Sequence, residues 1–198
     1  SGGTIAGSVF GAGKGEANTF ECKKAMAHST FVSITNGTVN GDVYGGGEVG
    51  RLEANTEVTI GEGDGVGAEE TPTSAPVIGG SVYGAGAGVE THGYFALVRG
   101  NTTVTVQGNA TVGASVFGGG EIASVGRYDL DAYLMPTILK GGGQCTVIVK
   151  GHAKIGTHGG GNVYGAGRGI TPNYIYGTGD KSEWSRRMML YSADFVNG

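Results

Sequence analysis

The 198-residue sequence has few of the features that mark membrane-spanning, nucleic-acid-binding or redox proteins. It has no apolar run long enough to cross a bilayer, so we expect no membrane insertion. Its net charge is −4 and its 13 Lys and Arg residues form no block or stripe, so we expect no nucleic-acid partner. The two cysteines, Cys22 and Cys145, form no CxxC pair, and the sequence does not decide whether they form a disulfide.

Proline is scarce and glycine is abundant. The chain has 4 Pro and 43 Gly without a Gly-X-Y period, which excludes a collagen triple helix. The hydrophobic fraction of 38% is rich in Val and Ile, which excludes a disordered Gly/Ser linker. Abundant glycine among regularly placed β-branched residues predicts many short strands joined by tight corners.

A string that contains a valine followed by an aromatic residue recurs five times, and we number these repeats 1 to 5. The copies are SVFGAG (8–13), DVYGGG (42–47), SVYGAG (81–86), SVFGGG (115–120) and NVYGAG (162–167). Successive marker valines are 34, 39, 34 and 47 residues apart. Four residues before the marker lies another apolar residue in repeats 1 to 4, whereas in repeat 5 Gly159 holds that place, Ile155 lies further upstream, and 159–161 indicates a short insertion.

A second strand precedes each of repeats 2 to 5 and alternates with a period of two, as in Val58-x-Ile60 and Val104-x-Val106. Such alternation is typical of a strand with one buried face. One repeat cannot bury this face alone, whereas repeats stacked like on like can, with about 4.8 Å between strands. We therefore predict an all-β fold, a parallel β-helix or β-solenoid of about five coils with inserted loops on one edge, as a single domain over 1–198.

Two columns follow from this stacking. The residue after each marker valine is aromatic, so an in-register stack places the rings one above another. Alternation with a buried valine favours rings that face outward, although the parity is open at a glycine corner. A ladder that stabilises the register and a flat strip that binds sugars or a partner are both compatible with this column. Past the corner, stacking places Lys14 beside Glu48 and Glu121 beside Arg168, which predicts ion pairs between repeats.

Insertions enter after the glycine corner of every repeat, at about 14–29, 48–55, 87–101, 121–144 and 168–187. In solenoids such insertions gather on one side, which is often the binding side. Aromatic residues beside Asp and Arg suit contact with a carbohydrate or a protein, and they suit packing of the loops equally well. The candidate binding residues are Tyr94, Phe95, Arg127, Tyr128, Asp129, Asp131, Tyr133 and Trp184.

The sequence carries no catalytic or zinc signature, and we expect no cofactor. The stretch GEGDGVG (61–67) is similar to calcium-binding nonapeptide loops, but it is a single copy without the GGxGxD order. A calcium ion near Asp64 is the alternative to a solvated turn. Cys145 shares its strand parity with the inward valines, which predicts a small buried residue there.

The five glycine-rich repeats resemble those of large secreted or cell-wall-attached bacterial proteins, including adhesin-like β-solenoids. The resemblance implies an extracellular or cell-surface module with a structural and adhesive role, whose loop edge binds a glycan or protein. It favours a binding module over an enzyme. It also implies a fragment of a longer repeat protein, continued end to end by further repeats. The alternative is a polysaccharide-active lyase or hydrolase on a β-helix scaffold, with Asp129 and Asp131 as the first candidates for catalytic carboxylates. Carboxylates about 5–9.5 Å apart would favour this alternative.

Overall fold

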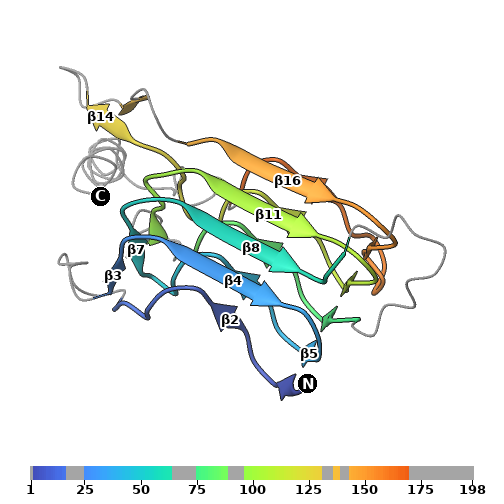
Figure 1. The fold of residues 1–198 in the computed structure, drawn as a ribbon. Helices are drawn as coiled ribbons and strands as arrows, with labels where there is room; N and C mark the ends of the chain where they lie inside the picture. The colour runs from blue at the N-terminus through green and yellow to red at the C-terminus, as the bar shows by residue number, and fades with distance from the viewer. Residues whose placement is uncertain are drawn as a thin grey trace, which may run out of the picture.

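We analysed a computed structural model of the chain, which describes residues 2–16, 25–63, 75–88, 96–130, 136–138 and 143–169. Within these ranges the protein is all-β and contains no α-helix. Successive repeats stack along one direction and form three sheets of parallel strands, in the manner of a β-solenoid (Figure 1). No helix of the described part is long and apolar enough to span a membrane.

Each of the three sheets takes equivalent strands from successive repeats. Sheet 1 contains β1 (Thr4–Ile5), β5 (Thr38–Val39), β9 (Val77–Ile78), β12 (Thr111–Val112) and β17 (Lys154–Ile155). Sheet 2 contains β2 (Val9–Phe10), β6 (Val43–Tyr44), β10 (Val82–Tyr83), β13 (Val116–Phe117) and β18 (Val163–Tyr164). Sheet 3 contains β4 (Thr30–Ile34), β8 (Thr56–Ile60), β11 (Thr102–Val106) and β16 (Cys145–Val149), which lie side by side in that order in Figure 1.

Two smaller sheets accompany these three. β3 (Met26–Ala27) pairs in parallel with β7 (Arg51–Leu52). The other pair, β14 (Tyr128–Leu130) and β15 (Pro136–Ile138), is antiparallel. A two-stranded antiparallel ladder needs only a short connection, so this hairpin is a local addition to the parallel stack.

The pairing register is the one that the repeats predict. The marker valines pair one on another through sheet 2, from Val9 to Val163. Ile155 pairs with Val112, so β17 occupies the sheet 1 position in repeat 5 and the glycines that follow form the extra segment. The inward valines and isoleucines of the three sheets form one continuous apolar core, in which Val58, Val82 and Val104 are fully buried. This core is the main stabilising feature of the stack.

A column of threonine hydroxyls holds sheet 3 to sheet 2. The hydroxyls of Thr30, Thr56 and Thr102 donate to the carbonyl oxygens of Gly45, Gly84 and Gly118, respectively. Thr56 and Thr102 are buried, so these bonds satisfy polar groups that water cannot reach. Cys145 pairs in register with Thr102 and carries a free thiol in place of the hydroxyl. It is half-buried, so the prediction of a small residue at this inward position is confirmed and its full burial is not.

Candidate functional site

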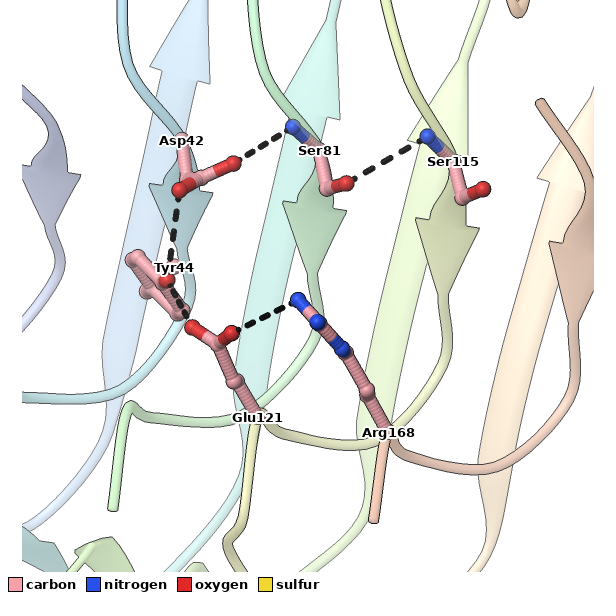
Figure 2. A network of polar contacts seen from close by, with 6 residues as sticks. All are labelled: Asp42, Tyr44, Ser81, Ser115, Glu121 and Arg168. Carbon is pink, nitrogen blue, oxygen red and sulfur yellow. Dashed lines mark hydrogen bonds and ion pairs between the residues drawn. The ribbon is translucent and has the colours of Figure 1, made fainter. Parts of the chain in front are cut away.

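A polar network lies around the strands of sheet 2 and the corner that follows them, and it joins repeats 2 to 5 (Figure 2). The Glu121 carboxylate accepts a hydrogen bond from the Tyr44 hydroxyl and forms an ion pair with Arg168 at 3.0 Å. The Tyr44 hydroxyl also lies 3.5 Å from Asp42 Oδ2, and Asp42 Oδ1 accepts a hydrogen bond of 2.6 Å from the backbone N–H of Ser81. Two carboxylates, one phenol and one guanidinium are therefore connected.

Parallel stacking positions each member of this network. Asp42 immediately precedes β6, in a column of residues that stand before the marker valines. The side-chain oxygens of this column accept the backbone N–H one repeat further on, as Ser8 does from Asp42, Ser81 from Ser115, and Ser115 from Asn162. Serine, aspartate and asparagine are short acceptors that suit such local bonds to the backbone. The column therefore stabilises the register along the sheet 2 edge.

Glu121 lies in the second column, with Lys14, Glu48, Ala87 and Arg168, each bridged to the next in parallel. The predicted ion pairs are confirmed: Lys14 Nζ lies 2.8 Å from Glu48 Oε1, and Arg168 Nη1 lies 3.0 Å from Glu121 Oε1. Ala87 has no long side chain, so the Glu121 carboxylate passes over it and bonds to Tyr44 of repeat 2. Stacking of equivalent positions indicates contacts between neighbouring repeats, so it did not indicate this contact between repeats 2 and 4.

Beneath the network lies the aromatic column. Phe10, Tyr44, Tyr83, Phe117 and Tyr164 stack with successive ring centroids 4.7–4.8 Å apart and interplanar angles of 2–10°. The three central rings are at most 8% exposed and form an apolar cluster separate from the main core. These three rings therefore lie apart from the core that holds the marker valines, as the alternation favoured, but they are buried in a cluster of their own and do not face solvent.

This burial also decides the chemistry of the tyrosines. Burial, the hydrogen bond to Glu121 and the negative charge of Asp42 raise the pKa of Tyr44 far above its ordinary value. Burial raises the pKa of Tyr83 as well, although a hydrogen bond with the Arg168 guanidinium opposes part of that rise. A tyrosine nucleophile or base needs its pKa lowered, so both shifts run against catalysis by these phenols. The network suits stabilisation of the corner.

A second cluster of charges lies near the small sheet of β3 and β7. Arg51 Nε lies 2.8 Å and Arg99 Nη1 lies 3.5 Å from the two oxygens of Glu53. The parallel bridge between Leu52 and Val98 places Glu53 and Arg99 side by side. Sequence reasoning missed this cluster because the apolar residues at this corner, such as Leu52, do not recur at a constant distance from the marker valines.

The described part of the chain contains no group of three or more His, Cys, Asp or Glu side chains that could hold a metal ion. Asp64, the proposed calcium ligand, lies outside the described residues. The calcium site therefore stays a prediction.

Most of the candidate binding residues fall outside the described ranges. Arg127 is exposed just before β14, and Tyr128 and Asp129 pair with Ile138 and Thr137 in the hairpin of β14 and β15. The residues outside the described ranges are Tyr94, Phe95, Asp131, Tyr133 and Trp184. The structure therefore brings Tyr128 and Asp129 together on one strand beside Arg127, and leaves the carboxylate pair of Asp129 and Asp131 a prediction.

Comparisons with protein-family models, curated proteins and solved structures found no match to this chain.

Proposed function

We propose that this chain is a β-solenoid of about five coils that serves as a structural and adhesive module of an extracellular bacterial surface protein. In this proposal the stack is a scaffold, and loops inserted along one edge bind a glycan or protein ligand. The observation that carries the proposal is the column of Lys14, Glu48, Ala87, Glu121 and Arg168. The five insertions that begin at about 14, 48, 87, 121 and 168 enter the chain at or just after this column, which favours one edge of the stack as their place, whereas the long connection 61–76 enters between β8 and β9.

The distribution of polar groups supports a scaffold with binding loops. The core columns hold the repeats together, and the threonine column joins sheet 3 to sheet 2 within each repeat. The tyrosine pKa shifts in the corner network disfavour the charged phenol. In contrast, Arg127 is exposed beside the strand that carries Tyr128 and Asp129. Exposed Arg and aromatic residues are common anchors of binding surfaces.

The test is a screen of the full chain against a glycan array and against mucin, by fluorescence and by biolayer interferometry. We expect binding that Arg127→Ala weakens at least about tenfold, which corresponds to about 1.4 kcal/mol. Lys150→Ala is the matched control, since Lys150 is also exposed but follows β16, away from the loop edge. Equal loss in both variants would indicate nonspecific charge attraction, and no binding to any glycan or to mucin would refute glycan display.

The enzyme alternative has its own measurement. Incubation with a panel of polysaccharides should produce neither reducing ends nor the ultraviolet absorbance of unsaturated lyase products. Release that Asp129→Asn abolishes would replace the scaffold proposal with a lyase or hydrolase. Likewise, a melting temperature that falls on addition of EDTA would support calcium near Asp64, and an unchanged one would count against it.

A further inference from the structure

The corners of the five repeats are of two alternating types. Repeats 1, 3 and 5 read GAGKG, GAGAG and GAGRG over 11–15, 84–88 and 165–169, and we call these neutral-or-basic corners. Repeats 2 and 4 read GGGEV and GGGEI over 45–49 and 118–122, and we call these acidic corners. The repeating unit of the corner is therefore a pair of repeats.

Backbone conformation and sterics follow the same alternation. Val49 and Ile122 in the acidic corners have φ of 55° and 51°, which β-branched residues rarely adopt. The equivalent Gly15 could not be valine, because its Cβ would lie 2.3 Å from the carbonyl oxygen of Val49 in the next repeat. Conversely, Gly46 and Gly119 could not be alanine, because their Cβ atoms would lie 2.6 Å and 2.5 Å from backbone nitrogens of repeats 3 and 5. Each corner type is shaped by a neighbour of the other type.

One glycine of repeat 5 has no neighbour within the described ranges that explains it. The residue after the aromatic ring is glycine in all five repeats. A Cβ on Gly11, Gly45, Gly84 or Gly118 would lie 2.1–2.4 Å from the carbonyl oxygen of the same glycine one repeat further on. Among the described residues, a Cβ on Gly165 would have no atom within 4 Å, and the same is true of Gly169, the counterpart of Gly15.

In the part of the chain that the structure describes, the rest of the repeat 5 face is also open. Val163, Tyr164 and Val149 are 49%, 45% and 43% exposed, whereas their counterparts in repeat 4 are buried. These residues continue the apolar and aromatic columns, and their backbones form the last strands of sheets 2 and 3. The Arg168 side chain is 60% exposed, and of the described residues Glu121 is the acid that pairs with it. An unpaired strand edge with apolar columns is a template for a further strand.

We propose that the face formed by β16, β17 and β18 is a docking surface for a coil of the acidic type, supplied from outside these 198 residues by a partner solenoid. Such a coil places a glycine carbonyl over Gly165, a valine over Val163 and a ring over Tyr164. Its glutamate lies beside Arg168, as Glu48 lies beside Lys14. The proposal requires only the stacking of coils and not glycan display, so a failed glycan screen leaves it untouched.

Two other occupants fit less well. A second copy of this chain presents repeat 1, whose neutral-or-basic corner would bring Lys14 beside Arg168. Like charges at that distance repel, and the alternation of corner types would be broken. Within the chain, the string IYGTGD at 175–180 carries an acid, but it begins 12 residues after Val163, where complete repeats require at least 34. Both acidic repeats of the chain itself already have neighbours on both faces.

The experiment compares Gly118→Ala with Gly165→Ala in three backgrounds, by thermal unfolding. The first is the full chain; the second repeats residues 16–49, an acidic coil, directly after Gly169; the third repeats residues 50–88, a neutral coil, at the same point. In the full chain we expect Gly118→Ala to lower the unfolding midpoint by about 4 °C or more, from the cost of overpacking, and Gly165→Ala to leave it unchanged. With the acidic coil added, Gly165→Ala should cost as much as Gly118→Ala, and with the neutral coil it should stay without effect.

Three outcomes would overturn the proposal. If Gly165→Ala already lowers the midpoint of the full chain, the face is occupied from within: a midpoint that rises with protein concentration would then identify a second copy, and an invariant one would identify residues 175–180. If Gly165→Ala has no effect in the acidic-coil background, or if that insertion unfolds the chain, the face does not accept such a coil. If the neutral coil responds as the acidic one does, the corner type does not select the partner.

Discussion

Thr102→Val tests whether the threonine column contributes through its hydroxyls or through its shape. Thr102 lies fully buried in β11, and its hydroxyl donates to the Gly118 carbonyl oxygen at the corner of the same repeat. Valine keeps the volume and the β-branched shape, so the strand and the core should stay intact. The change removes one buried hydrogen bond and leaves the Gly118 carbonyl without this donor. A buried polar group deprived of its partner costs about 1–3 kcal/mol, which for a chain of this size lowers the melting temperature by about 2–4 °C per kcal/mol.

The assay is urea unfolding followed by far-ultraviolet circular dichroism, with the slope m compared between variants so that a change in midpoint reads as a change in stability. Thr102→Ser keeps a hydroxyl and loses a methyl, and Thr103→Val makes the same chemical change on the outward face of the same strand. We expect Thr102→Val to lower the free energy of unfolding much more than Thr103→Val does. Thr102→Ser measures the cost of losing the methyl group, and we expect that cost to be too small to explain the difference. The reasoning fails if Thr102→Val is within about 0.3 kcal/mol of the parent protein, or if Thr102→Ser costs more than Thr102→Val.

Three further predictions concern neighbouring features. Cys145→Thr restores the column at repeat 5 and should raise the free energy of unfolding by about 0.5–1.5 kcal/mol in the same assay; no gain would mean that the Gly165 carbonyl is not aligned as Gly118 is. Tyr44→Phe keeps the ring stack but removes the bond to Glu121. The pKa of Tyr44 is raised in the folded state, so the stability that this phenol contributes is complete below about pH 10 and is lost as the pH rises above that. The free energy of unfolding should therefore decline less steeply in the variant between about pH 9 and 11.5, the range in which free tyrosine ionises. Lys14→Met removes a largely exposed ion pair and should change stability by no more than about 0.5 kcal/mol; a larger loss would show that Lys14 acts through more than its charge.

The sequence sufficed to predict features that depend on equivalence between repeats. Parallel in-register stacking places each residue on its counterpart, so the pairing of Val43 with Val82 and the ion pair of Lys14 with Glu48 follow from counting residues alone. The position of Ile155 in sheet 1 also follows, because the interval between repeats 4 and 5 is longer and contains extra glycines.

Features that depend on the path of the chain through a corner could not be predicted in this way. Period-two alternation assumes an extended strand, and it ends where β6 turns into Gly45, so it misjudged the burial of the Tyr44 ring. The contact of Glu121 with Tyr44 joins non-equivalent positions two repeats apart, so counting equivalent residues does not indicate it. The contact of Thr102 with Gly118 recurs in repeats 2 to 4, but the repeat pattern alone does not tell which two columns meet across the corner. The candidate binding residues of the insertions were chosen by residue type alone, because the insertions share no pattern from one repeat to the next.

The bond between Glu121 and Tyr44 has a mechanical consequence. Most contacts of a stacked repeat protein join nearest neighbours, so a pull along the stack can open one interface at a time. Glu121 passes over Ala87 and ties repeat 4 to repeat 2, while its other oxygen holds Arg168 of repeat 5. Under tension, repeats 2 to 5 should therefore unfold together, because one glutamate of repeat 4 is bonded to both repeat 2 and repeat 5 and repeat 3 lies between them.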